Sequence, residues 1–526
     1  MNSARRKASI LLLFTGLLLS ACGNDLWGTY PQDATPTPEN TSLAQSTDSS
    51  PLVTQVYPST AQATPTNFPT PTIVPSRTIV AGTPQPSIIY ISQSGDWLQA
   101  VAQHFGVEVS EIKSVTDLPT TGLLNPDTYL VIPNRLANVI TTPSIPIIPD
   151  SEVIFSATSV GFDYETYIQM KGGKLSTYRD PYESIISTGV DDIQRMAFGS
   201  SISPRILLAL VQWYTGWVYG PPKPGVNDTY PLGYTDPVDT LYYPKLYQQM
   251  RLMVRDLLAG YYGWRGGTLT ELVFPDGSKL RLAPGLNAGT VALEYLFAQK
   301  LNYSDWLRAI DPSSGFPALF SSMFGDPWDR ANGFDIFPPD LTQPTFTLPF
   351  EVGVVWNLTG GPHPAWEQES AWAALDFAPG MAPPGGCSPS DAWVVAVTGG
   401  TIVRSDAGYV VLDLDGDGYE ETGWDVLYLH IATKDRILVG TVVKAGDRIG
   451  HPSCEGGEAT GTHVHIARKY NGEWVAAGDP LPFVMSGWTA HTGDAPYKGT
   501  LTKGDQTVTA HQSVSTSTII IRKPDE

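Results

Sequence analysis

The sequence predicts a multidomain protein. It ends in an antiparallel β-sheet domain with long loops, preceded by a mainly helical middle domain and a small βααβ module. The chain has 526 residues, which is too long for a single hydrophobic core. Short apolar runs separated by glycines fill residues 393–450, a pattern typical of antiparallel strands and turns. A longer apolar run follows Ser203 and Pro204 and indicates a helix.

Composition and spacing divide the chain into six segments. We expect a signal peptide with a lipidation site (1–22), a linker (23–86), a small module (87–136), a helical domain (150–345), a β-sheet domain (346–490) and a C-terminal tail (491–526). The tail contains strand-like runs but carries no functional prediction. Lys and Arg total 32 against 52 Asp and Glu, a formal balance of −20. This balance argues against a nucleic-acid partner, whose binding depends on basic surfaces.

The first residues have the features of an export signal. Basic residues at Arg5 and Arg6 precede an apolar run from Ile10 to Leu19. That run is too short to span a membrane as a helix. The small residues before Cys22 resemble a bacterial lipobox, which implies a lipidated Cys22 that anchors the chain to the membrane, on the extracytoplasmic side of the bacterial cell envelope. A plain signal peptide with an incidental cysteine is the alternative.

The linker, residues 23–86, is rich in proline, threonine and serine. Such a composition cannot bury a core, so we expect an extended, disordered tether or a simple spacer.

The small module is predicted to fold as strand, helix, helix and strand. The strands lie near Tyr90 and before Pro133, the first helix spans Ala100–Gly106, and the second begins within Val107–Ile112. This order resembles a LysM module, which implies binding of N-acetylglucosamine-containing glycan strands. Trp97 stands where that family usually has threonine. A structural LysM fold with weak affinity is the alternative.

The middle domain is predicted to be a non-catalytic scaffold or glycan-docking domain. The run from Ser203 to Trp217 faintly resembles the first catalytic helix of lysozyme-like lytic transglycosylases, but Tyr214 occupies the position of their glutamate. Without that general acid, glycoside cleavage is not expected. Glu294 would replace it only by coincidence.

Four histidines and one aspartate carry the clearest chemical signal. Half of the eight histidines fall at positions 363, 430, 463 and 465, and Asp376 lies between the first two. In a strand, residues i and i+2 point to the same side, so His463 and His465 would face one site. Two imidazoles, a third histidine and a carboxylate suit a catalytic zinc with one position left for water.

The order of motifs around these residues resembles the lysostaphin-like zinc metallopeptidases, which cut peptide bonds in bacterial cell-wall peptidoglycan. The resemblance covers roughly residues 347–486. It consists of a first histidine, an aspartate before Phe-Ala-Pro, Tyr-x-His, Gly-Asp-x-Ile-Gly and Thr-Gly-Thr-His-x-His. It implies a peptidoglycan zinc metalloendopeptidase that hydrolyses stem or cross-bridge peptides.

Carried over by position, the resemblance implies that His363, Asp376 and His465 ligate Zn²⁺. It implies that His430 and His463 form an unliganded catalytic pair. One would take a proton from water and the other would stabilise the oxyanion, in either order. The alternatives are an inactive peptidoglycan-binding or regulatory lipoprotein, and an enzyme whose cleft is covered by its middle domain.

One spacing departs from most of this family. Thirteen positions separate His363 from Asp376, where four are usual. The sequences around both residues look more similar to the beta-lytic branch, in which this gap is longer.

Two cysteines, Cys387 and Cys454, lie inside the proposed peptidase domain. In an exported protein they suggest a disulfide, with two free thiols as the alternative. The bond would join the loop after Asp376 to the loop before His463.

Alternating acidic residues match early positions of a calcium-binding loop. They are Asp413, Asp415, Asp417 and Glu421, at positions 1, 3, 5 and 9. Position 12 is Trp424 rather than glutamate, and Asp-Gly pairs also favour a plain hairpin turn. A bound Ca²⁺ would stiffen the hairpin that leads to His430.

Overall fold

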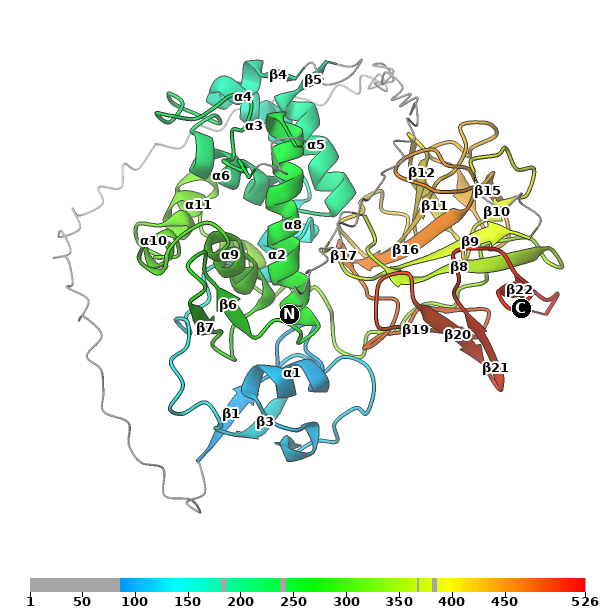
Figure 1. The fold of residues 1–526 in the computed structure, drawn as a ribbon, viewed down its shortest axis with the longest axis horizontal. Coiled ribbons are helices and arrows are strands. Elements are labelled where there is room, and N and C mark those ends of the chain that lie inside the picture. The colour runs from blue at the N-terminus through cyan, green and yellow to red at the C-terminus, as the bar shows by residue number, and fades with distance from the viewer. Residues whose placement is uncertain (1–85, 181–185, 237–242, 367–368, 381–385, 526) are drawn as a thin grey trace, which may run out of the picture. The chain divides into compact units, whose positions relative to one another are not determined.

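The computed structural model describes residues 86–526 apart from 181–185, 237–242, 367–368, 381–385 and 526 (Figure 1). The predicted signal peptide, Cys22 and the linker up to residue 85 lie outside these described residues. Within the described ranges, no helix combines the length and the apolar character needed to cross a membrane.

The small module contains a three-stranded sheet in the order β1-β3-β2 and one α-helix. Its elements are β1 (Ser87–Ile91), α1 (Leu98–Phe105), a 3-10 turn (Val109–Glu111), β2 (Lys113–Ser114) and β3 (Tyr129–Pro133). The predicted second helix over Val107–Ile112 is wrong, because this stretch forms only the 3-10 turn. Glu108 and Glu111 cap that turn reciprocally. The chain then extends into β2, which pairs with β3.

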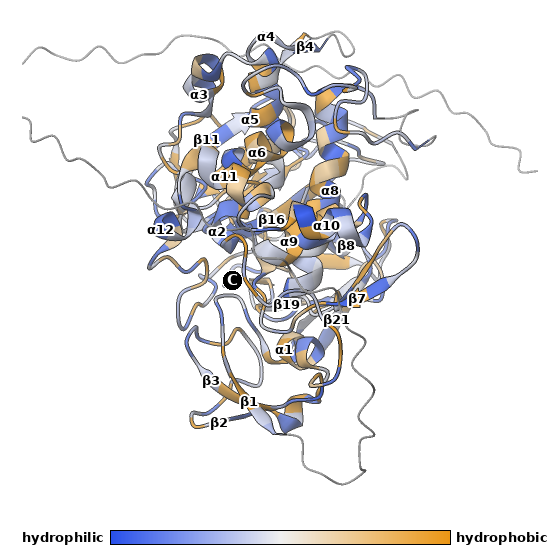
Figure 2. Cartoon of the chain, turned by 90° about the vertical axis from the view of Figure 1, so that its left-hand side faces the viewer, coloured by the Kyte–Doolittle hydropathy of each residue, from blue (hydrophilic) through white to orange (hydrophobic). Residues whose placement is uncertain are grey.

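The middle domain is helical, as predicted, with two small hairpins. Its helices are α2 (Asp150–Val153), α3 (Tyr164–Lys171), α4 (Lys174–Thr177), α5 (Gly189–Ser200), α6 (Pro204–Thr215), α8 (Lys245–Arg265), α9 (Ala288–Ala298), α10 (Tyr303–Ala309), α11 (Phe316–Phe324) and α12 (Pro327–Ala331). The hairpins pair β4 (Arg179–Asp180) with β5 (Ser187–Thr188), and β6 (Glu271–Val273) with β7 (Lys279–Arg281). Hydrophobic residues recur along α5, α6, α8 and α9 (Figure 2) and contribute to one core.

Helix α6 begins and ends where the sequence predicts. Pro204 occupies its first turn, where the missing N–H costs nothing, and Gly216 ends it with φ of 70°. Glu294 in α9 is 1% exposed, and burial raises its pKa to about 8. A carboxyl group buried in a helical core does not face a substrate.

The C-terminal part is built on an antiparallel sheet in the order β14-β11-β12-β13-β16-β9-β8-β22, with β17 paired to β16. The strands are β8 (Val355–His363), β9 (Ala374–Pro379), β11 (Gly400–Asp406), β12 (Tyr409–Asp413), β13 (Trp424–Leu429), β14 (Val442–Val443), β16 (Val464–Tyr470), β17 (Glu473–Trp474) and β22 (Ile519–Ile521). A short pair, β10 (Val394–Val395) with β15 (Arg448–Gly450), lies beside it in sequence. The strands predicted over 393–403, 426–430 and 442–450 are present.

Both faces of this sheet are covered. On one face, Val426 and Tyr428 join a large apolar core, whereas Leu427 and Ala467 belong to a second cluster against which Tyr262 of α8 packs. Every residue of β13 is buried, which explains its continuous apolar sequence. His465 lies two residues before Ala467, so it shares the face on which α8 packs.

The tail belongs to the same β-rich region. A second sheet has the order β18-β19-β20-β21 and comprises β18 (Val484–Met485), β19 (Trp488–Thr492), β20 (Gly499–Lys503) and β21 (Gln506–Thr509). The last strand, β22, pairs with β8 at the edge of the main sheet. The two strand-like runs read from the tail sequence are therefore β21 and β22.

Arg265 at the end of α8 connects three parts of the chain. Its guanidinium donates to Asp150 Oδ2 at 2.8 Å and to Glu473 Oε1 at 3.0 Å, and it also bonds the Ser94 carbonyl of the small module. Tyr261 OH donates to Glu473 Oε2 at 2.7 Å. Because these groups are largely buried, the α8 end is a fixed support beneath β17.

Candidate metal centre

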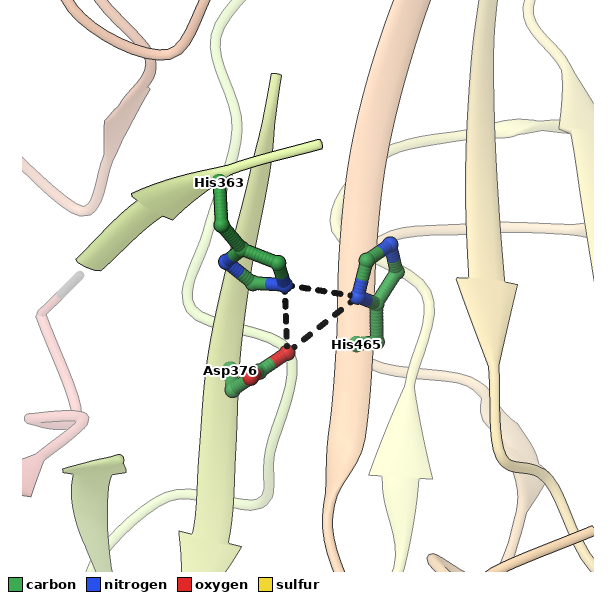
Figure 3. A group of neighbouring side chains, drawn as sticks. All are labelled: His363, Asp376 and His465. Carbon is green, nitrogen blue, oxygen red and sulfur yellow. Dashed lines mark hydrogen bonds and ion pairs between the residues drawn. The ribbon is translucent and has the colours of Figure 1, made fainter. Parts of the chain in front are cut away.

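Three adjacent strands bring His363, Asp376 and His465 together (Figure 3). Asp376 of β9 stands opposite His465 of β16 in the ladder, and β8 flanks β9 on the other side. The β8–β9 register shifts between Gly360 and His363. This irregularity re-aims the end of β8, so that His363 points its ring toward the other two side chains.

The three facing atoms form a nearly equilateral triangle. His363 Nε2 lies 3.0 Å from His465 Nδ1 and 3.3 Å from Asp376 Oδ1, and His465 Nδ1 lies 3.2 Å from the same oxygen. Ligand atoms about 2.0–2.1 Å from a tetrahedral zinc would lie about 3.3 Å apart. The triangle therefore fits a small tetrahedral cation.

The remaining ring nitrogens are held by backbone carbonyls. His363 Nδ1 lies 2.8 Å from Gly361 O, and His465 Nε2 lies 2.9 Å from Ala365 O. With those nitrogens donating, the two nitrogens that face each other both present lone pairs. Asp376 Oδ1 is buried and has no hydrogen-bond donor among the described residues. Three acceptors aimed at one point, without a proton between them, fit a bound cation.

Electrostatics at the triangle favour an ionised aspartate. Burial alone would raise the pKa of Asp376, but the neighbouring His363 and His463 outweigh it and hold this pKa well below its usual range. For His363, burial lowers the pKa, and the Asp376 charge overcomes that effect and raises it. Burial lowers the pKa of His465. The site is arranged around one carboxylate.

His430 and His463 lie beside the triangle. Their ring centroids are 4.4 Å apart, and His463 Nε2 is 3.7 Å from Asp376 Oδ1. Each ring is oriented by a carbonyl: His430 Nδ1 lies 2.9 Å from Glu455 O, and His463 Nδ1 lies 2.7 Å from Gly461 O. Burial, with the charges of the two nearby histidines, lowers the pKa of His430 to about 3. The structure thus brings together all five residues singled out by the sequence.

The predicted disulfide between Cys387 and Cys454 is confirmed. The neighbouring Gly386 pairs with Gly461, whose carbonyl holds His463. The bond therefore closes a loop next to the site.

Tyr497 is a site residue that sequence reasoning missed. Its ring stacks on His363 with centroids 4.1 Å apart and an angle of 22° between planes. Its backbone pairs with the end of β8, since its N–H donates to Pro362 O at 3.2 Å and its carbonyl accepts from Gly361 at 3.0 Å. Burial raises the pKa of its hydroxyl. No motif marks this residue, which lies between β19 and β20.

The acidic loop lies between β12 and β13, away from this triangle in the sheet order. Carboxylate oxygens of Asp413, Asp415 and Asp417 lie within 4.8 Å of one another, a group that does not include Glu421.

Comparisons with known proteins give relatives for two regions. Residues 146–339 match the family model described as LasA, N-terminal domain. The chain is 24% identical over 364 residues to Protease LasA of Pseudomonas aeruginosa, in strains PAO1 and UCBPP-PA14, covering 64% of this chain and 76% of the relative. The helical domain thus has a different relative from the lytic transglycosylases that its sequence faintly resembles.

Solved structures match the C-terminal part. The M23 metalloprotease pseudoalterin is 22% identical, with a TM-score of 0.27, over 33% of this chain and 98% of that one. The catalytic domain of lysostaphin from Staphylococcus simulans is 21% identical, with a TM-score of 0.16, over 24% of this chain and 89% of that one. A zinc-containing peptidase from Vibrio cholerae is 20% identical, with a TM-score of 0.18, over 27% and 41%.

Proposed function

We propose that this chain is a zinc-dependent endopeptidase that hydrolyses peptide bonds of bacterial peptidoglycan. The observation that carries the proposal is the triangle of His363, Asp376 and His465, in which three acceptors converge at 3.0–3.3 Å. Similarity to Protease LasA over 64% of the chain supports a peptidase. The motif resemblance supports peptidoglycan stem or cross-bridge peptides as substrate.

In this proposal His363 Nε2, Asp376 and His465 Nδ1 hold the zinc. The metal would supply Lewis-acid polarisation of a peptide carbonyl and activation of water at neutral pH. The carbonyls of Gly361 and Ala365 fix the two imidazoles in the tautomers that ligation requires. Burial excludes competing water from most of the centre.

His430 and His463 handle protons and charge. Because each donates its Nδ1 proton to a carbonyl, each keeps Nε2 available toward the substrate side. One accepts a proton from the attacking water, and the other donates a hydrogen bond to the developing oxyanion. The protonated base then returns its proton to the leaving amine.

The rest of the chain would keep this centre near its substrate. We propose that lipidated Cys22 anchors the chain outside the cytoplasm and that the small module binds the glycan strands. Two attachments to one envelope raise the effective concentration of peptide substrate.

The test is digestion of purified peptidoglycan by the full chain, with mass spectrometry of the products. We expect new peptide termini with the native protein and at least a hundredfold slower release with Asp376→Ala. His511→Ala is the matched control, because His511 is exposed and remote from the triangle in the structure's contacts. Zinc binding and wall binding without any new termini would instead support the inactive, regulatory alternative.

A further inference from the structure

A second cluster of acids lies in the hairpin between β12 and β13. Asp413 is buried at the end of β12, and Asp415 and Asp417 follow in the exposed turn. The side chain of Asp415 folds over Gly423, where a Cβ atom would lie 2.3 Å from its Oδ2. Only glycine leaves room for this carboxylate to turn inward, toward Asp413.

Asp425 provides an independent observation at the base of the hairpin. It is fully buried, and neither carboxylate oxygen has a hydrogen-bond partner among the described residues. It stands opposite Asp413 in the β12–β13 ladder, so both side chains lie on the same face of the sheet. Directly opposed like charges repel, so this arrangement needs a compensating group.

The electrostatic environment of Asp425 places it within reach of the acidic turn. Burial raises its pKa well above the usual range, and the charges of Glu420, Asp413 and Asp415 raise it further, against an opposing effect of Lys469. The pKa of Asp415 is also raised, by burial first and then by Asp413 and Asp417. These carboxylates form one interacting group.

The protein cations nearby are already engaged elsewhere. Lys469 Nζ donates to Glu420 Oε2 at 2.8 Å, and Arg404 donates to both oxygens of Glu420. Glu420 therefore takes both positive charges, and no hydrogen bond or ion pair from either cation reaches Asp413 or Asp425 among the described contacts. The four aspartates are left with uncompensated negative charge.

We propose that this hairpin binds a calcium ion through Asp413, Asp415 and Asp417, with Asp425 completing the site from the sheet. The donors are all carboxylate oxygens on a loop with room to adjust, which suits the six to eight oxygen ligands of Ca²⁺ better than the strict octahedron of Mg²⁺. The absence of nitrogen or sulfur donors in this group of four disfavours zinc. This site is separate from the histidine centre and stands whether or not that centre is catalytic.

Calcium would matter for the sheet because β13 leads directly into His430. A cation that neutralises the Asp413–Asp425 pair removes repulsion across the first pair of the β12–β13 ladder. The strand that carries His430 is then held along its whole length.

The test is titration of the full chain, freed of metal by a chelator, with Ca²⁺ alone. We expect one equivalent to bind, with a rise of several degrees in the melting temperature at saturation. Asp415→Asn and Asp417→Asn should each weaken binding at least tenfold. Asp505→Asn is the matched control, because this acid lies in the exposed β20–β21 turn. Asp376→Ala should bind Ca²⁺ normally, since it alters only the histidine centre.

Asp425→Asn separates the proposal from a simpler account, in which Asp425 is only a neutral, protonated acid. In our account this variant loses calcium affinity while the metal-free protein becomes no less stable, because a repulsive pair is removed. Unchanged calcium affinity in Asp425→Asn would overturn the role of this residue. No binding by the native chain, or equal binding by the Asp415 and Asp417 variants, would overturn the site itself.

Discussion

Each imidazole at the candidate metal centre uses one nitrogen for a backbone carbonyl and keeps the other for chemistry. The residue types and their spacing were readable from the sequence because the family resemblance rests on contiguous motifs such as Thr460–His465. The partners that orient the rings were not readable. Gly361, Ala365 and Glu455 offer only their carbonyls, and a carbonyl leaves no signature in a sequence.

Tyr497 should support His363 through stacking rather than through its hydroxyl. Tyr497→Ala removes the ring that covers His363, so we expect about tenfold weaker zinc binding, a size typical for the loss of a group that supports a ligand. Tyr497→Phe should bind zinc normally. Competition with a coloured chelator measures both affinities, and Tyr303→Ala, an exposed tyrosine elsewhere, is the control. Equal zinc affinity in all three variants would contradict the stacking role.

His104 should make stability depend on pH. It is buried against Trp264, with ring centroids 3.5 Å apart, and burial lowers its pKa to about 3. The unfolded chain therefore takes up this proton at higher pH than the folded one does. Stability is complete above about pH 6.5 and falls as the pH drops toward 3, by a few kcal/mol on this residue's account. Urea unfolding at pH 7 and pH 4.5 measures the loss, and His104→Gln should show a smaller difference between the two. An identical pH dependence in the variant would refute this assignment.

At the scale of elements, continuous apolar strands such as β13 were predictable because the sheet is covered on both faces. The second helix of the small module was not, because a six-residue amphipathic stretch is too short to form a helix on its own. There, pairing of β2 with β3 determines the outcome. Tyr497 and Asp425 were missed for a related reason. Their importance depends on pairing with strands far away or opposite in the sheet.

The disulfide should stabilise the loops around His463. It closes a loop of 67 residues, which corresponds to about 4 kcal/mol in the chain-entropy model. We expect the Cys387→Ser and Cys454→Ser double variant to unfold at a lower denaturant concentration than the native protein. Adding reductant should lower the midpoint of the native protein and leave the variant unchanged. A native midpoint insensitive to both changes would rule out a stabilising role.

On the scale of the whole molecule, one arginine links the small module, the helical domain and the main sheet. Arg265→Ala leaves Glu473 buried without its cation, and breaking such a pair costs about 3–5 kcal/mol. We therefore expect a lower unfolding midpoint and faster proteolysis near residue 94. Arg308→Ala, at an exposed ion pair within α10, should change neither. Equal stability of the two variants would show that the Arg265 contacts do not hold the three parts together.

The measurement that tests the central claim most directly is the zinc X-ray absorption spectrum of the full chain, combined with its metal content. The account predicts about one zinc per chain in addition to any calcium, bound by two imidazole nitrogens and one carboxylate oxygen with a further light-atom ligand. Asp376→Ala should lose most of this zinc, and His511→Ala should keep it. Zinc with thiolate ligands, or equal zinc content in the two variants, would contradict the account.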